Sequence, residues 1–170
     1  MEYSLTLRAC MLTSVLSLFA LAAAADEQSG LRAGTAAVDI SPTVFPIQLR
    51  SGPSHYVHDP LYVRAIAFEN GTGRAVLAVV DAIGVGREMC DAAKTKVAEK
   101  TGWKTSEMLI CGTHTHSAPR GVDTTPGRIA YEEKRGKGIV QALTKAIESL
   151  AAAKVGFASD EEPSEVYNRR

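Results

Sequence analysis

The sequence predicts an α/β fold in which a mixed β-sheet is flanked by helices. Short runs of β-branched and apolar residues alternate with two longer amphipathic segments, a pattern typical of this class. Two of the runs are separated by a four-residue turn and therefore form a hairpin, which makes the sheet mixed rather than wholly parallel. The chain has 170 residues, of which 45% are hydrophobic, and this composition suits one globular core.

The first 25 residues are expected to form a signal peptide that is cleaved on export. Residues 9–25 carry no charged side chain, are rich in Leu and Ala, and end in small residues, which is the pattern of a secretory signal peptide. An uncleaved membrane anchor is the alternative, but three hydroxyl-bearing residues in this stretch weaken a permanent span. We expect cleavage before Asp26, a secreted or periplasmic protein without a stable membrane span, and a domain formed by residues 26–170.

The charge balance excludes two classes of partner. The chain has 19 Lys and Arg residues against 19 Asp and Glu residues, and its pI is about 6.9. Such a chain has no general electrostatic attraction for phosphate backbones or anionic lipids. Neither nucleic-acid binding nor peripheral membrane binding is expected.

The first half of the domain is predicted to consist of strands and one long loop. Residues 31–40 lack a helical period and end at a Ser-Pro pair, so they are predicted to form a strand. Residues 43–60 contain three prolines and two of the four histidines, which predicts a long loop of the kind that is often functional. Residues 61–69 and 74–82 are predicted to form the hairpin. The second of these strands is apolar on both faces, so we expect a central strand covered on each side.

The second half alternates helices with short strands. Residues 87–100 place apolar side chains four positions apart, which predicts an amphipathic helix. Residues 108–112 are expected to form a short buried strand. Residues 129–153 are predicted to form a second helix, although two glycines could interrupt its first part. A further strand is expected at 154–159.

The three cysteines do not indicate a disulfide framework. Cys10 leaves with the signal peptide. Cys90 falls in the first predicted helix and Cys111 in the strand at 108–112. We expect two free, buried thiols, with a single bridge as the alternative in an oxidising compartment.

The most informative motif is the pair of histidines that follows the strand at 108–112. His114 and His116 are separated by one residue, so on an extended chain they point to the same side, about 7 Å apart. Ligands of open α/β sheets collect beyond the carboxyl ends of strands, where this pair is placed. Neutral imidazole is a common zinc ligand, so the pair could supply one or two ligands or an acid-base group. Solvated or structurally hydrogen-bonded imidazoles are the alternative.

Other polar residues could complete such a site. Asp81 ends the central strand and could orient a histidine, or it could cap the following turn. His55 and His58 lie in the Pro-rich loop beside Asp59, where solvated side chains are the simpler interpretation. A zinc site made from His58 together with the two motif histidines is a further hypothesis.

Four segments, in the same order, resemble one known family. Residues 31–42 resemble the opening of the neutral/alkaline non-lysosomal ceramidase N-terminal domain, and residues 58–64 resemble its next segment. The strand that ends at Asp81 resembles that family's central strand. Residues 113–119 resemble its His-Thr-His-Ser-Gly-Pro signature, with Ala118 in place of the usual glycine.

This resemblance implies a zinc-dependent amidase that cleaves the amide bond of N-acylsphingosine or a related lipid-like N-acyl amide. It implies that His114 is a zinc ligand, that His116 hydrogen-bonds the substrate or the tetrahedral intermediate, and that Arg169 lines the pocket. In the family, a second His, a Glu and a Tyr complete the zinc site from downstream regions. Residues 26–170 are therefore expected to be the N-terminal part of a ceramidase-type catalytic domain whose partner is a missing C-terminal part. The alternative is a non-catalytic secreted binding domain that retains only the fold.

Overall fold

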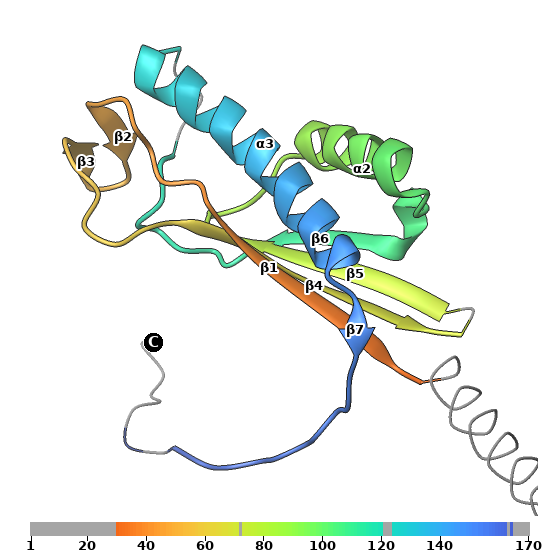
Figure 1. Cartoon of the computed structure of the whole chain (residues 1–170). Coiled ribbons are helices and arrows are strands. Elements are labelled where there is room, and N and C mark those ends of the chain that lie inside the picture. Colours follow the sequence, from red (N-terminus) through yellow and green to blue (C-terminus); the bar gives the residue numbers. More distant parts are fainter. Residues whose placement is uncertain (1–29, 72, 121–123, 163, 165–170) are drawn as a thin grey trace, which may run out of the picture.

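The computed structural model describes residues 30–71, 73–120, 124–162 and 164. In these residues a five-stranded sheet carries two long helices on one face, and a small two-stranded sheet lies beyond one end (Figure 1). The predicted class, an α/β fold with a mixed sheet and flanking helices, is confirmed.

The main sheet combines antiparallel and parallel pairs. In spatial order the strands are β6 (Met108–Gly112), β5 (Gly73–Val80), β4 (Tyr62–Asn70), β1 (Arg32–Asp39) and β7 (Ala151–Ala152). β1 pairs antiparallel with β4 and with β7, β4 pairs antiparallel with β5, and β5 pairs parallel with β6. The predicted hairpin is therefore correct, and a crossover connection through a helix adds the parallel strand.

Two predictions for the segments outside these strands are wrong. Residues 43–60 are not all loop, because β2 (Ile47–Leu49) and β3 (Gly52–Ser54) form a small antiparallel hairpin. Strands of three residues, one of which contains Pro53, are too short to show a periodicity in the sequence. The strand expected at 154–159 does not form, because the chain pairs with β1 only at β7 and then leaves the sheet edge.

Both long helices form close to their predicted positions. α2 (Arg87–Thr101) ends at Gly102, whose left-handed backbone (φ 71°) suits glycine. α3 (Pro126–Glu148) begins three residues before the predicted start, because the Thr125 side chain accepts a hydrogen bond from the Arg128 backbone N–H. Its predicted end at residue 153 is wrong, since the helix ends at Glu148 and Ala151–Ala152 pair with β1 as β7. A short 3₁₀ helix, η1 (Thr105–Glu107), leads into β6.

Neither Gly136 nor Gly138, the two glycines expected to interrupt the second helix, breaks α3. Gly138 is buried, and a Cβ there would collide with the side chain of Ile40, so the small residue lets α3 approach the sheet closely. Gly136 has more room, since the nearest atom that a Cβ would meet is the Met89 methyl carbon at 4.0 Å. Close packing against the sheet offsets the low helix propensity of glycine at position 138.

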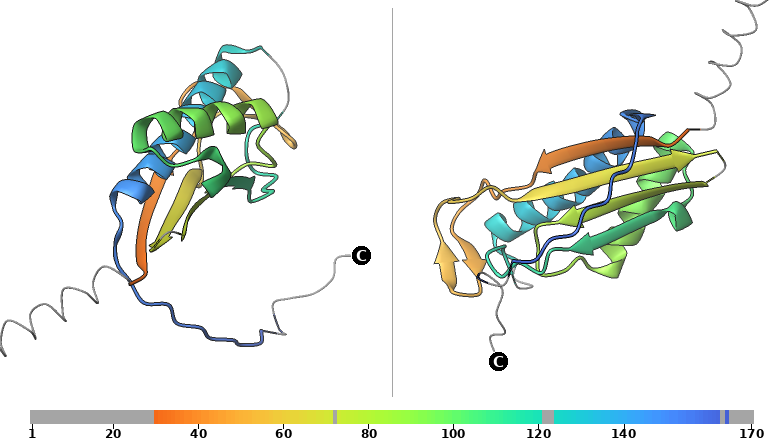
Figure 2. Two further views of the ribbon diagram at one scale, coloured as in Figure 1. Left: turned by 90° about the vertical axis from the view of Figure 1, so that its right-hand side faces the viewer. Right: turned by 90° about the horizontal axis from the view of Figure 1, so that it is seen from below.

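Both helices cover the same face of the sheet, and this arrangement decides where the core lies (Figure 2). Alternate residues of the central strands are buried under α3 together with Ile139 and Leu143 of that helix. The buried strand residues are Val63, Ala65, Ala67, Val76, Ala78 and Val80.

The expectation that the central strand would be covered on each side is wrong. β5 is interior to the sheet, but Val79, on its other face, is 37% exposed. Among the described residues no helix or strand packs on that second face (Figures 1 and 2).

The different exposure of the two cysteines is explained by the helices covering only one face of the sheet. Cys90 and Cys111 are free, as expected, but they are not both buried: Cys90 is half-buried on α2 and Cys111 is exposed. Cys111 is exposed because β6 is an edge strand and this residue lies on the uncovered face. Burial raises the pKa of the Cys90 thiol, with smaller contributions from the charged residues around it.

The expected signal peptide lies outside the described residues. Within the described part of the chain, no helix is both long enough and apolar enough to cross a bilayer.

Candidate functional site

The candidate site is built where β5 and β6 end together. The two strands are parallel, with Val80 opposite Gly112, so the segments that follow them leave the sheet side by side. The Thr113 N–H donates to the Val80 carbonyl and the His114 N–H donates to the Ala82 carbonyl, each at 2.9 Å. These bonds hold the start of residues 113–119, which we call the motif loop, against the segment that follows β5.

Glycine is required at the end of β6. A Cβ at Gly112 would lie 2.9 Å from the Ala82 carbonyl oxygen and 3.2 Å from the Gly84 Cα. Any other residue would push the two segments apart and would displace His114 from its backbone partner. The glycine thus positions the motif without taking part in its chemistry.

His114 is held in a defined orientation. Its backbone is left-handed (φ 62°), which is uncommon for a residue with a Cβ, and its Nδ1 lies 2.8 Å from the Ile83 carbonyl oxygen. A carbonyl can only accept a hydrogen bond, so Nδ1 carries the proton. In the neutral ring the lone pair is then on Nε2, which can bind a metal ion or accept a proton.

His116 lies close to His114, but for a reason different from the predicted one. The two ring centroids are 5.2 Å apart and the rings meet edge to face at 63°. Both residues lie beyond β6, in a loop that turns at His114, and not on one face of a pleated strand. The predicted proximity is therefore present, while the turn brings the rings closer than the expected 7 Å.

Asp81 does not orient either histidine. Its Oδ2 accepts a hydrogen bond from the Tyr62 N–H at 2.9 Å and is paired with the Arg64 guanidinium at 2.8 Å. The Arg64 guanidinium also lies 4.7 Å from the centre of the Tyr62 ring. The carboxylate thus ties the start of β4 to the end of β5, a structural role.

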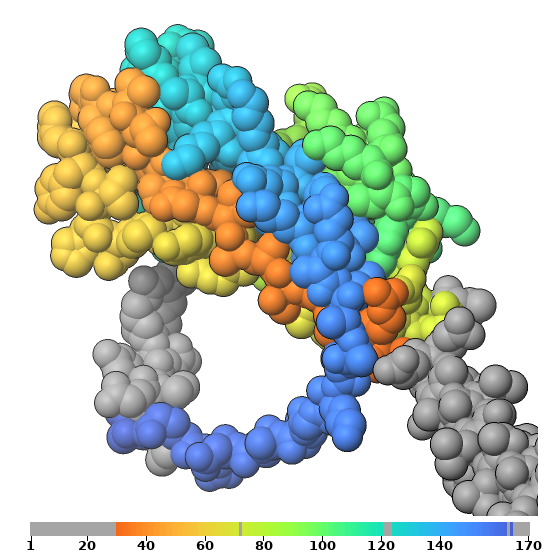
Figure 3. Space-filling view, in the orientation of Figure 1, coloured from red at the N-terminus to blue at the C-terminus, as the bar shows by residue number. Residues whose placement is uncertain are grey.

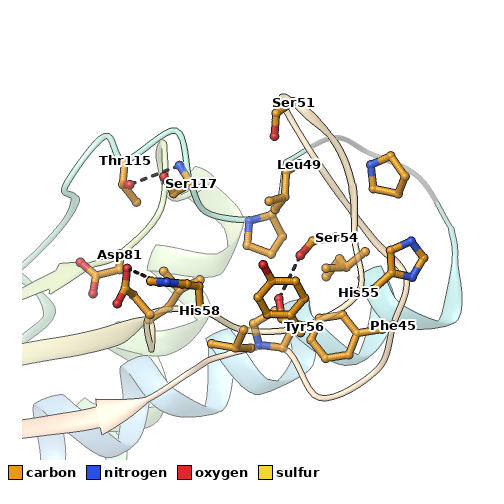
Figure 4. Close-up of a pocket in the computed structure, with 17 residues that line it drawn as sticks. Phe45, Leu49, Ser51, Ser54, His55, Tyr56, His58, Asp81, Thr115 and Ser117 are labelled. Carbon is orange, nitrogen blue, oxygen red and sulfur yellow. Dashed lines mark hydrogen bonds and ion pairs between the residues drawn. The ribbon is translucent and has the colours of Figure 1, made fainter.

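A cavity of about 760 Å³ lies beside the motif loop, between that loop and the β2–β3 hairpin (Figure 4). Thr115 and Ser117 of the motif line it, as does Asp81, whereas His114 and His116 are not among the lining residues. Its apolar wall comes mainly from the Pro-rich segment: Phe45, Ile47, Leu49, Tyr56, Val57 and Leu61. The volume is in the range of small-molecule sites.

The sequence predicted only part of the role of the Pro-rich segment, residues 43–60. The density of prolines predicted a functional loop, but not that the loop folds into a hairpin that faces the motif. That meeting is a long-range contact, and no local pattern encodes it.

The histidines of the Pro-rich segment do not join the motif pair. His58 pairs with Asp59 at 3.1 Å, and both side chains are more than four-fifths exposed. No three His, Cys, Asp or Glu side chains within the described ranges form a group that could hold a metal ion. The hypothesis of a zinc site made from His58, His114 and His116 is therefore wrong, and His55 and His58 are solvated residues that line the cavity.

These residues do not form a complete zinc site. A catalytic zinc ion in proteins usually has three protein ligands, whereas the described residues offer the two adjacent imidazoles of the motif. The anchored Nδ1 of His114 is compatible with one ligand bond through Nε2, because zinc-bound histidines commonly donate their other ring N–H to a carbonyl or carboxylate. Arg169, the third predicted site residue, lies outside the described residues.

Comparison with known proteins supports the fold assignment. No family model matches the chain, and no curated protein sequence matches it. Among solved structures, the neutral ceramidase from Pseudomonas aeruginosa is similar, with a TM-score of 0.63 and 18% identity over 72% of this chain and 22% of that one. A ceramidase complexed with C2 has a TM-score of 0.59 and 17% identity over the same shares. The chain thus spans about a fifth of the length of these ceramidases, and the part it spans has a ceramidase-like fold.

Proposed function

We propose that this chain forms the histidine-bearing part of a zinc-dependent hydrolase of the ceramidase type, which cleaves the amide bond of N-acylsphingosine or a related N-acyl amide. The observation that carries the proposal is the fixed His114 ring at the carboxyl ends of two parallel strands, beside an apolar-walled cavity. The ceramidase-like fold supports the choice of reaction.

The described residues assign a role to each part of the motif. His114 would present Nε2 to the zinc ion, with its other nitrogen held by the Ile83 carbonyl. His116, beside it, would donate a hydrogen bond to the oxyanion that forms on the amide carbonyl. A bound zinc ion supplies a water whose pKa falls to about 7. Because the described residues hold no third ligand, the proposal requires ligands from outside them.

The cavity would bind the hydrocarbon part of the substrate. Phe45, Leu49 and Tyr56 give it an apolar wall, and Thr115 and Ser117 place hydroxyl groups at the motif end (Figure 4). An acyl chain could lie against the wall while its polar end reaches the hydroxyls. Arg169, assigned to the pocket by family resemblance, would add a cation that stabilises the same oxyanion.

Zinc binding tests this proposal directly. We expect the chain to bind zinc weakly, and His114→Gln to abolish that binding in a calorimetric titration. His55→Gln is the matched control, because His55 is an exposed histidine of the same cavity and is not one of the proposed zinc ligands. If both variants bind zinc as the parent does, His114 is not a ligand and the proposal fails.

The apolar wall of the cavity supports one alternative, a secreted binding domain that takes an apolar ligand there without catalysis. A fluorescent N-acyl amide distinguishes the two. Amine release that requires both added zinc and His114 supports the hydrolase. Saturable binding of the lipid that is unchanged in His114→Gln, with no amine released, supports the binding domain.

A further inference from the structure

The uncovered face of the sheet, which we name the open face, carries a cluster of apolar side chains next to one arginine, Arg64, which pairs with Val79. The strand register sets Ile66, Leu77 and Leu109 side by side across β4, β5 and β6. Phe68 and Val79 occupy the neighbouring rows on the same face. Leu109 is 54% exposed and Val79 is 37% exposed. Antiparallel sheets normally present polar side chains on a face that meets water, so this face is built to be covered.

A second exposed apolar feature belongs to the segment that follows β7, residues 153–162. Phe157 is 94% exposed and Val155 is 76% exposed, the two highest values among the large apolar side chains of the described residues. These side chains are two positions apart, so on an extended chain they point the same way.

The segment is tethered next to the open face. Ala151 pairs with Ala33 of β1, and the Ala153 N–H donates to the Leu31 carbonyl at 2.8 Å, which fixes the start of the segment at one sheet edge. From there it runs beneath the open face, crossing the direction of the strands (Figure 2). The space-filling view shows that it stands clear of the body (Figure 3).

The segment is long enough to cross the sheet. Three strand spacings of about 4.8 Å separate β1 from β6, a span of about 14 Å. Ten extended residues reach about 33 Å. The tether also keeps the effective concentration of the segment at the face high, so a modest apolar contact suffices for docking.

We propose that residues 153–162 form a strap that docks on the open face and places Phe157 against the row of Ile66, Leu77 and Leu109. Docking removes two apolar surfaces from water at once, and the tether at β7 limits the entropy lost. The occupant is the chain's own segment, because that segment is already held beside the face and carries matching exposed apolar side chains.

The reactivity of the Cys111 thiol can report whether the strap is docked on the open face. It is free and exposed, and it lies on the open face directly across from Val79. Cys90, on α2, lies on the other side of the sheet. A chain with Cys10→Ser and Cys90→Ser therefore has one thiol, whose rate of reaction with a small disulfide reagent measures how often the open face is accessible.

The experiment compares this single-thiol chain with the same chain carrying Val155→Asp and Phe157→Asp. A strap docked about nine-tenths of the time slows the reaction of Cys111 about tenfold, and the two aspartates should restore the faster rate. Gly156→Ser is the matched control. On an extended chain, a side chain at position 156 points away from Val155 and Phe157, so this change should leave the slow rate unchanged. Circular dichroism verifies that each variant is folded.

Two results would overturn the strap. Equal rates in the parent and the double aspartate variant mean that the segment does not cover the face. Protection that increases with protein concentration, with a doubled mass by light scattering, means that a second copy of the chain covers it instead. The assay needs neither zinc nor substrate, so its outcome is independent of the proposed hydrolase.

Discussion

The two faces of the main sheet are built from the same strands but differ in what they contact. On one face, Val63, Val76 and Val80 are fully buried under α3. On the other, Leu109 and Val79 remain partly exposed, although they are as apolar as the residues beneath the helices. Apolar composition therefore does not determine burial in this protein. Burial depends on which face the two helices cover (Figure 2).

The largest expected effect comes from matched truncations on the two faces. Leu143→Ala removes a side chain of α3 that has no exposed surface and packs on the helix-covered face, and it should lower the free energy of unfolding by about 2–5 kcal/mol. Leu109→Ala, at a half-exposed site on the open face, should cost less than about 1 kcal/mol. Urea unfolding followed by Trp103 fluorescence measures both. A loss at Leu109 as large as that at Leu143 would mean that the open face is packed as tightly in solution as the helix-covered face, which is more than a docked strap of ten residues would provide.

A smaller effect is expected from two glycines of α3, which test how closely that helix packs on the covered face. Gly138→Ala sets a methyl group against Ile40 and should destabilise by about 1–3 kcal/mol. Gly136→Ala has space and should stabilise by up to about 1 kcal/mol through higher helix propensity. The shift in melting temperature gives the sign of each change. Stabilisation by Gly138→Ala would show that α3 stands further from the sheet.

The smallest effect is expected at Asp39, which ends β1 and connects the sheet to α3. Partial burial raises the pKa of its carboxyl, but hydrogen bonds from the Ser41 N–H and from Lys134 outweigh this, and the net pKa is lowered below 3.8. A lowered folded-state pKa contributes stability above the unfolded pKa, and this contribution is lost as pH falls through the folded value.

Asp39→Asn should therefore cost less than about 1 kcal/mol at pH 7, because the ion pair with Lys134 is half-exposed and screened. Below the folded pKa of Asp39, parent and variant should have equal stability. Unfolding at a series of pH values measures the difference. A gap that persists at the lowest pH would mean that the asparagine disturbs packing and not charge.

The elements themselves were largely predictable. The hairpin of β4 and β5 followed from two apolar runs around a glycine-rich turn, and α2 followed from its four-residue period and Gly102. The short hairpin of β2 and β3 was not predictable, since its strands are too brief to show a period. The strand expected at 154–159 failed because its apolar residues meet no partner strand.

The candidate site, too, has features that the sequence predicted and features that it could not predict. The sequence identified His114 and His116 as a pair, because their spacing and their place after a strand are local features. It could not predict that His114 is held by the Ile83 carbonyl, nor that Asp81 is occupied by Arg64. These contacts join residues that are 17 or more positions apart.

By itself the sequence determined the fold class, the hairpin of β4 and β5, both long helices and the histidine pair. Each of these follows from local periodicity, turn residues or residue spacing. Only the tertiary structure decided that both helices cover one face, that the Pro-rich segment meets the motif loop around a cavity, and that Cys111 is exposed. These outcomes depend on contacts between distant segments. An apolar residue has the same identity whether a helix covers it or not, so the sequence pattern alone cannot distinguish the two faces.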